Sequence, residues 1–414
     1  MNETVSLGVP YMHPVCPLSL NHVKLFVIAD TFARFQRMEG NKVYFPLGFH
    51  YSGIEPITLS EKISGALKGE ENGFLEKLEK THDIDSGDFS RLTAPLDLLD
   101  YFSERQIRDL KKLEITADFD NIYHTKEMRY EKYLDALYIQ YDDCNVIINT
   151  SEGSALKYSD KIWKQDVKNQ LSVTKIITPN LKKILEDRLD TFFGEYYFVR
   201  SRGIGKKYGG GIIEPMSDSE LFNLFEAQEG LTKLPITRFF VEEHLKTWVI
   251  KRIFAETLIL PDQLRTKEYS VLGMGKYDGK IISASKGIGE MLPSLLNKYG
   301  KNLTRVSLLL TSHPSKNFNW TGESALSSKK ILKKYERFKS CMLGLSAGKN
   351  PELDNLIDES KMIIRGNMKS GDFRFACLEA LVEMPKKVKM MMLNSKGNAD
   401  KYFHYIDELF GLGE

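Results

Sequence analysis

The first 53 residues most constrain the fold of this chain, because they combine two apolar runs with one long amphipathic helix. The run SLGVPYM predicts a buried strand that opens into a proline-containing loop. Apolar residues then recur at helical spacing over Leu20–Met38, with Ser19 as the N-cap and Gly40-Asn41 beyond the end. The run KVYFPLGF predicts a second strand. Strand, helix and strand form a βαβ unit, which is typical of a parallel sheet covered by helices.

The chain has 414 residues, of which 42% are hydrophobic and 28% charged, and its net charge is +2. These values are typical of a folded globular protein of two or three domains without a strong overall field. No apolar run reaches the roughly 18 residues of a membrane span, so we expect no membrane as a partner. We also expect no DNA as a partner. The four cysteines share no short spacing, which argues against a zinc site or a disulfide framework. With no export signal at the N-terminus, this predicts a cytoplasmic protein.

The pattern changes three times along the chain. We expect residues 1–145 to form the first half of an α/β core with a helical insertion, and residues 231–316 to form the second half. Between them, residues 146–230 mix charged helical patterns with glycine-rich turns and are predicted to be a short insertion. Nearly all of residues 317–414 has a helical pattern, which predicts a C-terminal α-helical domain.

Three segments, in this order, resemble class I aminoacyl-tRNA synthetases, and most closely the archaeal and eukaryotic leucyl type. PLSLNHVKLFVIADTFARFQRMEGNKVYFPLGFHYSG resembles the first signature motif, its helix and a Gly-Phe-His-x-Thr-Gly loop. YFSERQIRDLKKLEITADFDNIYHT is similar to a helix followed by Gly-x-x-x-Asp-Trp. GKIISASKGIGEMLPSLLNKYGKNLTRVSLLLTSHPSKNFNW resembles the second signature loop with the segment after it.

The resemblance implies a Rossmann-like parallel-sheet catalytic core, split by an insertion and followed by helices like the start of an anticodon-binding bundle. It implies ATP, with Mg²⁺, bound between the half-sheets. It also implies leucine or a similar amino acid as substrate, and tRNA contacted through the C-terminal helical domain. No separate metal site is expected.

The first signature of the family, His-x-Gly-His, corresponds here to Ser19-Leu20-Asn21-His22. In the family both histidines touch the nucleotide phosphates, and the glycine lets adenine stack on the backbone. A helix N-terminus supports such contacts, because its free N–H groups attract phosphate. His22 is kept, but Ser19 carries no charge and Asn21 places a side chain where the base approaches. The resemblance therefore implies a nucleotide site around Ser19, Asn21 and His22 that departs from the family pattern.

The second signature, Lys-Met-Ser-Lys-Ser, corresponds to Ile281-Ile282-Ser283-Ala284-Ser285. The family's second lysine stabilises charge on the triphosphate, and such cationic clamps dominate phosphoryl chemistry. Both lysines are missing here. Lys280 and Lys286 flank the loop and are the candidates to replace them, with Ser283 and Ser285 as nucleotide-binding positions.

A third nucleotide contact also departs from the family. The family places Gly-x-Asp before a helix that carries a histidine, and the aspartate holds the ATP ribose. In PITRFFVEEH the histidine is His244, whereas Thr237 and Phe239 take the glycine and aspartate positions. On the same resemblance, Tyr11, His13 and His50 lie on segments that line the amino-acid pocket.

Simpler readings of these motifs stay open. His22 and His244 are equally typical of helix starts, where an imidazole bonds a loop carbonyl or faces solvent. GIGKKYGGG lacks the ending of a phosphate loop and favours a hairpin or turn. The lysines of SSKKILKKYERFK and MPKKVKMMML suit either a solvated helix face or contacts to tRNA phosphates.

Two functions therefore compete. The first is a leucyl-tRNA-synthetase-like ligase with weakened catalysis, in which His22, Lys280 and Lys286 act on the triphosphate. It would lack editing, since the 146–230 insertion is short and offers no threonine-rich hydrolytic pocket. The second is a catalytically inactive paralogue that binds an amino acid, tRNA or a protein. A nucleotidyl transferase acting on a small metabolite is a third class.

Overall fold

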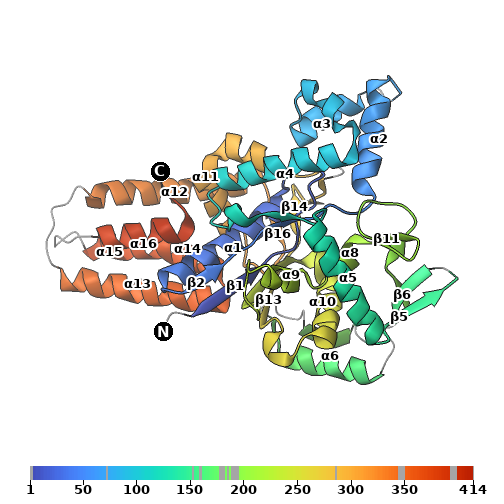
Figure 1. The fold of residues 1–414 in the computed structure, drawn as a ribbon. Helices are drawn as coiled ribbons and strands as arrows, with labels where there is room; N and C mark the ends of the chain where they lie inside the picture. The colour runs from blue at the N-terminus through green and yellow to red at the C-terminus, as the bar shows by residue number, and fades with distance from the viewer. Residues whose placement is uncertain are drawn as a thin grey trace.

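The structure is a computed structural model that describes residues 3–70, 73–151, 153–157, 161–176, 182–183, 186–187, 195–284, 287–343, 350–391 and 399–413. A parallel sheet lies at the centre of these residues, with strand order β2-β1-β12-β13-β7 (Figure 1). Its strands are β1 (Thr4–Gly8), β2 (Lys42–Tyr44), β7 (Lys175–Ile176), β12 (Arg238–Glu242) and β13 (Glu268–Leu272). Every pairing between them is parallel.

The first βαβ unit forms as the sequence predicts. Helix α1 covers Leu20–Met38, the predicted range, and β1 pairs with β2 with Val5 opposite Val43. The second strand differs from the prediction, because KVYFPLGF divides into β2 and the two-residue strand β3 (Gly48–Phe49). Strand β3 leaves the main sheet and pairs with β4 (Tyr123–His124). Pro46 lies at the break, where its missing N–H ends the ladder of β2.

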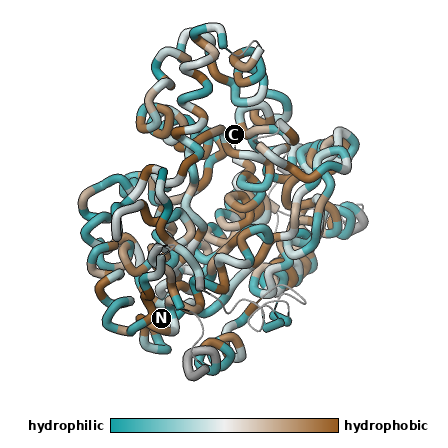
Figure 2. The backbone as a smooth tube through the Cα atoms, turned by 90° about the vertical axis from the view of Figure 1, so that its right-hand side faces the viewer, coloured by the Kyte–Doolittle hydropathy of each residue, from teal (hydrophilic) through white to brown (hydrophobic). Residues whose placement is uncertain are grey.

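Helices cover both faces of the sheet, which gives the Rossmann-like core that the resemblance implies. Side chains of β12 alternate between two hydrophobic cores: Phe240 packs in one, and Phe239 and Val241 pack in the other. The first core contains α1 and α11 (Leu292–Leu310). The second contains α5 (Met128–Asp143), α9 (Phe222–Gln228) and α10 (Lys246–Ile259). Hydrophobic stretches accordingly concentrate inside the molecule and hydrophilic ones on its outer turns (Figure 2).

The segment predicted to be an insertion is partly joined to the core sheet. Strand β7 lies within residues 146–230, yet it forms the sheet edge beside β13. The rest of the described part of this segment carries short antiparallel strands and helices. The strands are β5 (Ile147–Thr150), β6 (Gly153–Lys157), β8 (Glu195–Tyr197), β9 (Val199–Arg200), β10 (Lys207–Tyr208) and β11 (Gly211–Ile213), and the helices are α6 (Lys161–Val173), α8 (Pro215–Asp218) and α9. The GIGKKYGGG stretch forms the β10–β11 hairpin, one of the two readings that its sequence favours.

Helices also form a lobe above the sheet and a lobe beside it (Figure 1). The first lobe consists of α2 (Glu55–Leu67), α3 (Phe74–His82) and α4 (Pro95–Lys112) around a small core. The second follows the short strand β16 (Phe318–Trp320) and comprises α12 (Gly322–Leu343), α13 (Pro351–Ser370), α14 (Phe373–Leu378), a π-helical turn (Glu379–Glu383), α15 (Met384–Met391) and α16 (Asp400–Phe410). The described part of 317–414 is therefore mainly helical, as its pattern predicts.

A buried arginine joins this second lobe to the core. Arg305 on α11 donates to Oδ2 of Asp30 on α1 at 2.5 Å and to the carbonyl of Phe410 on α16 at 2.7 Å. Arg305 and Asp30 are both fully buried.

None of the described helices combines the length and apolarity that crossing a lipid bilayer requires. Among the described side chains, no group of three or more His, Cys, Asp or Glu has a metal-binding arrangement.

Candidate functional site

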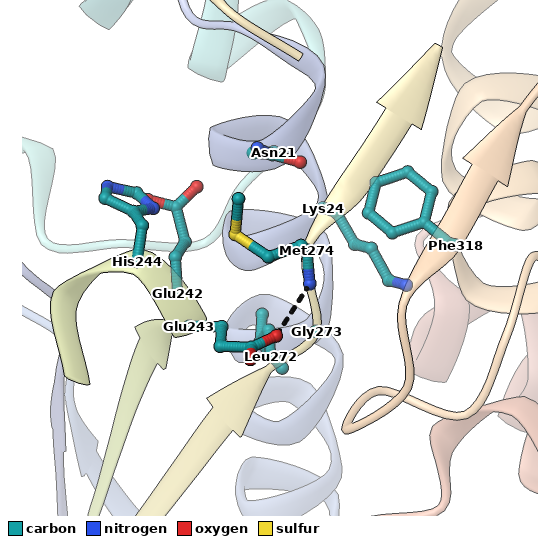
Figure 3. A pocket seen from close by; sticks show the side chains of 9 residues that line it. All are labelled: Asn21, Lys24, Glu242, Glu243, His244, Leu272, Gly273, Met274 and Phe318. Atoms are coloured by element: carbon teal, nitrogen blue, oxygen red, sulfur yellow. Dashed lines mark hydrogen bonds and ion pairs between the residues drawn. The ribbon is translucent and has the colours of Figure 1, made fainter. Parts of the chain in front are cut away.

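The candidate site lies where β1, β12 and β13 end. Strand β1 pairs with β2 on one side and with β12 on the other. Successive strands are therefore added to the sheet in opposite directions from β1, which makes it a topological switch point. Open α/β sheets bind ligands in the crevice outside the carboxyl ends of the strands at such a switch point. Helix α1 begins at this edge, and its first turns contribute Asn21 and Lys24 to a small pocket with residues that follow β12 and β13 (Figure 3).

His22 is held at the start of α1 by its own helix cap. The backbone N–H of Ser19 donates to Nδ1 of His22 at 3.3 Å, and Oγ of Ser19 lies 3.0 Å from the same atom. Because Nδ1 accepts the backbone N–H, the proton of the neutral ring is on Nε2. That nitrogen lies 3.8 Å from Oε2 of Glu242, too far for a hydrogen bond. His22 thus has a capping role, while its other ring nitrogen is directed toward Glu242.

Two carboxylates at the end of β12 also face the pocket. Glu242 is 6% exposed, and its Oε1 is buried without a hydrogen-bond partner among the described residues. Nε2 of His244, whose side chain is 46% exposed, lies 3.7 Å from Oε2 of Glu242. Oε2 of Glu243 accepts the backbone N–H of Met274 at 3.3 Å (Figure 3). Sequence reasoning missed both glutamates, although VEEH placed two acids directly at the end of a predicted strand.

Lys24 is a further residue that sequence reasoning missed. It is 1% exposed, and its Nζ donates to Oγ of Ser312 at 3.0 Å and lies 4.0 Å from the centre of the Phe318 ring. Burial lowers the pKa of Lys24 to about 7. It is the only lysine in the described lining of this pocket, and its head points away from Glu242 toward β16 (Figure 3).

Asn21 fills the space above Gly275, the first residue of β14 (Gly275–Tyr277). A Cβ on Gly275 would lie 2.1 Å from Oδ1 of Asn21, and 2.6 Å from side-chain atoms of both Ile282 and Phe318. Oδ1 of Asn21 is itself buried without a hydrogen-bond partner among the described residues. The pocket beneath has a volume of about 10 Å³, enough for about one water molecule. This pocket, as folded, is too small to hold a purine base.

Lys280 and Ser283, the described candidates of the signature loop, do not line this pocket. Lys280 is exposed on strand β15 (Lys280–Ile281) and is absent from the pocket lining. Ser283 exchanges backbone hydrogen bonds with Ile288 at 2.9 Å, which closes the loop on itself. Ser285 and Lys286 lie outside the described residues.

The two positions that the resemblance assigns to the ribose contact, Thr237 and Phe239, are engaged within the sheet. Phe239 belongs to the core beneath the sheet, and a Cβ on Gly8 would lie 2.3 Å from its ring. Oγ1 of Thr237 accepts the backbone N–H of Ser6 at 3.1 Å. Both positions therefore stabilise the sheet, and neither offers a carboxylate to a ligand.

A second polar cluster lies between the loops that follow β1 and β3. Nε2 of His50 lies 2.6 Å from Oδ1 of Asp218 and 2.8 Å from Oγ of Ser52. A Ser-His-Asp relay needs the serine and the aspartate on different ring nitrogens, so this arrangement is no acyl-transfer triad. Burial raises the pKa of Asp218, although His50 opposes the shift. The ring of His13 lies 6.1 Å from that of His50, and burial together with His50 lowers the pKa of His13 to about 4.

Tyr11 extends this cluster toward a buried acid. Its ring lies 5.8 Å from that of His50, and its hydroxyl lies 2.6 Å from the hydroxyl of Tyr123. The Tyr123 hydroxyl in turn donates to Oε1 of Glu226 at 2.7 Å. Burial raises the pKa of Glu226 to about 7. The three residues predicted for an amino-acid pocket, Tyr11, His13 and His50, are thus brought together by the fold.

The 146–230 segment covers one side of this cluster. Gly53 and Ile204 exchange backbone hydrogen bonds at 2.9 Å, which holds the GIG loop against the loop that carries His50. A Cβ on Gly205, whose φ is +137°, would lie 3.2 Å from Cβ of Ser52. Glycine is therefore required for this close approach.

No protein-family model matches the chain. The leucine–tRNA ligase of Archaeoglobus fulgidus is 32% identical over 146 residues, which are 35% of this chain and 15% of that protein. The leucine–tRNA ligase of Methanococcus aeolicus is 28% identical over 147 residues, 36% of this chain and again 15% of the relative. The matched segment thus spans about a seventh of each relative's length.

Among solved structures, methionyl-tRNA synthetase of Mycobacterium tuberculosis in complex with methionyl-adenylate superposes with a TM-score of 0.74 at 11% identity. The superposition covers 99% of this chain and 87% of that one. The chain is therefore similar in sequence to leucine–tRNA ligases over a third of its length, and it has the fold of a class I aminoacyl-tRNA synthetase over nearly all of it.

Proposed function

We propose that this chain is a leucyl-tRNA-synthetase-like protein in which the family chemistry, ATP-dependent activation of an amino acid and its transfer to tRNA, is strongly weakened at the nucleotide site. The proposal rests on sequence similarity to leucine–tRNA ligases and on the synthetase fold. The observation that carries the weakening is the position of Asn21, whose side chain lies above Gly275 and lines a pocket of only about 10 Å³.

The charges at the site support the same proposal. A triphosphate with Mg²⁺ needs cations that converge on its oxygens. The described pocket instead presents Glu242 and Glu243, and Lys24 is bound to Ser312 with a pKa lowered to about 7 by burial. As folded, these residues do not fit a nucleoside triphosphate, and binding one requires at least the side chain of Asn21 to move.

We assign His50, His13 and Tyr11 to the pocket for the amino acid, with leucine as the first ligand to test. We assign His22 and His244, which lie near Glu242 at the proposed nucleotide site, to contact with a phosphate or ribose. The helices of 317–414 are proposed to contact tRNA, because their lysines can bind phosphates without sequence preference. Neither a hydrolytic editing site nor a separate metal site forms part of this proposal.

A non-catalytic paralogue is the second candidate, and one observation favours it. The cluster of Tyr11, His13 and His50 is built and buried, whereas the nucleotide pocket is filled by the protein's own side chains. A protein that binds an amino acid or tRNA without activating it would show this combination.

ATP–pyrophosphate exchange with each of the twenty amino acids distinguishes the two candidates. The ligase proposal predicts slow but measurable exchange with one amino acid, increased by Ala284→Lys, which restores the loop lysine. Exchange that is absent in both forms, together with calorimetric binding of an amino acid, establishes the paralogue. A tRNA gel shift at two salt concentrations then tests the nucleic-acid partner, because phosphate contacts weaken steeply with salt.

A further inference from the structure

A groove of about 680 Å³ crosses the C-terminal lobe between α12 and α15. On the α12 side it is lined by one face of the helix, from Ile331 to Met342. On the opposite side it is lined from Leu381 to Lys389, which covers the π-helical turn and most of α15. None of the residues that line the groove also lines the pocket of the candidate site. The inference below concerns a protein partner and is separate from the tRNA contacts proposed above for this lobe.

The floor of the groove is apolar. Met342 and Leu381 are buried, Phe338 and Val382 are half-buried, and Pro385 lies beside them. The α12 members recur three, four and seven residues apart, which places them in one stripe along the helix. This stripe is about 16 Å long at 1.5 Å per residue, the length of three helical turns.

The rim of the groove is cationic on both sides. Lys334 and Arg337 project from α12, and Lys386 and Lys389 project from α15; all four are exposed. Lys386 has a partner in Glu383 at 2.8 Å, whereas the described residues offer the other three no carboxylate within ion-pair distance. Among the described residues that line the groove, none is acidic.

We infer that this groove is a docking site for an amphipathic helix of a partner protein, with an apolar stripe flanked by acidic residues. Two parallel helix faces with an apolar floor suit the ridges of a third helix, the geometry of helix-in-groove recognition. The rim on both sides selects acidic flanks, because opposite charges steer the encounter and like charges oppose it. RNA fits less well: its bases need exposed aromatic faces for stacking, and Phe338 is the single aromatic ring in the described lining.

Cys341 provides a direct test, because it is exposed and lines the groove, while Cys144 at the end of α5 is a second exposed thiol outside it. Burial raises the pKa of Cys16 to about 12, so that thiol stays unreactive. Maleimide labelling of the full chain, resolved by peptide mass spectrometry, is measured with a synthetic amphipathic helix of about 18 residues that carries leucines on one face and glutamates beside it. At a peptide concentration about ten times Kd, we expect Cys341 to react about tenfold more slowly and Cys144 to react at an unchanged rate.

Charge reversal tests the rim. In fluorescence anisotropy with the labelled peptide, Lys334→Glu combined with Lys389→Glu is expected to raise Kd by about tenfold or more. The matched control, Lys330→Glu with Lys401→Glu, changes two exposed lysines outside the groove and is expected to leave Kd unchanged. Thermal unfolding confirms that both variants are folded.

Several results overturn the inference. If a peptide with lysine in place of glutamate binds as tightly as the acidic peptide, the cationic rim does not select the partner. Decanoate, a fatty-acid anion, serves as the probe for a lipid chain. If tRNA or decanoate protects Cys341 and the acidic peptide does not, the groove is assigned to that ligand. Unchanged labelling of Cys341 with every probe shows that the groove binds none of them.

Discussion

Nε2 of His22 lies 3.8 Å from Oε2 of Glu242, so the histidine at the start of α1 faces a carboxylate of the protein itself. A helix N-terminus with a histidine favours anions. Here the group nearest the Nε2 atom in the ion pairs of this histidine is the buried carboxylate of Glu242. Adjacent strands of the sheet bring these two residues together from positions 220 residues apart (242 − 22).

Glu242→Gln should strengthen ATP binding. The substitution keeps the shape of the side chain and removes one negative charge close to the phosphate position. At the effective dielectric of such a site this change is worth about 1–2 kcal/mol, or about tenfold in Kd. Calorimetric titration with ATP measures it, and Glu323→Gln, an exposed acid on α12, is the control that should leave Kd unchanged. Unaltered ATP binding by a folded Glu242→Gln variant would contradict the electrostatic argument.

Substitutions at Asn21 should change the room for a nucleotide base and the stability of the fold in different ways. Asn21→Ala removes a buried acceptor for which the described residues offer no partner. Such groups cost about 1–3 kcal/mol, so this variant should be at least as stable as the parent. Asn21→Gly should be about 1 kcal/mol less stable than Asn21→Ala, because glycine is a weak helix former. Adenosine affinity should rise in the order Asn, Ala, Gly as the space above Gly275 opens. Urea unfolding and equilibrium dialysis measure the two effects, and a reversed order of affinity would show that Asn21 does not block the base.

Lys24→Met should change how stability depends on pH. Burial lowers the pKa of Lys24 from 10.5 to about 7 in the folded protein, so between these pH values the unfolded chain binds more protons than the folded one. Stability of the parent therefore rises with pH across this window, by up to about 1.4 kcal/mol per pH unit. The variant lacks this dependence, so its advantage should be largest at pH 7 and below and shrink toward pH 10. Urea unfolding from pH 6 to 10 checks it, with Lys330→Met as the exposed control; parallel curves for parent and Lys24→Met would refute the assignment.

Asp30→Asn should destabilise the junction between the core and the C-terminal lobe. The variant leaves the fully buried guanidinium of Arg305 without its counter-charge, which costs about 3–5 kcal/mol. Burial raises the pKa of Asp30, but Arg305 and Arg34 lower it further, so the net shift is downward. The stabilisation is therefore present above the unfolded pKa near 4 and is lost as the pH falls through the lower folded pKa. Urea unfolding at pH 7 should show the full loss in the free energy of unfolding of Asp30→Asn. As the pH is lowered, the difference in this free energy between parent and variant should decrease. Asp358→Asn, on the exposed face of α13, should show neither effect.

The local elements of this protein follow closely from its sequence. Helix α1 occupies the predicted Leu20–Met38, since its apolar spacing and the Ser19 cap act within a few residues. The division of KVYFPLGF was missed, although Pro46 signalled it. The role of Lys24 could not be inferred from pattern alone, because a lysine on an amphipathic helix is normally exposed.

The sequence by itself determined the parallel βαβ core, the helical C-terminal lobe and the order of the motifs, because periodicity and capping are local properties of the chain. Only the tertiary structure decided that Glu242 and Glu243 face the start of α1, that Asn21 fills the space above Gly275, and that Lys280 lies away from the pocket. Charge and volume at a site depend on distances between strands and loops far apart in the chain, and packing, not propensity, sets those distances.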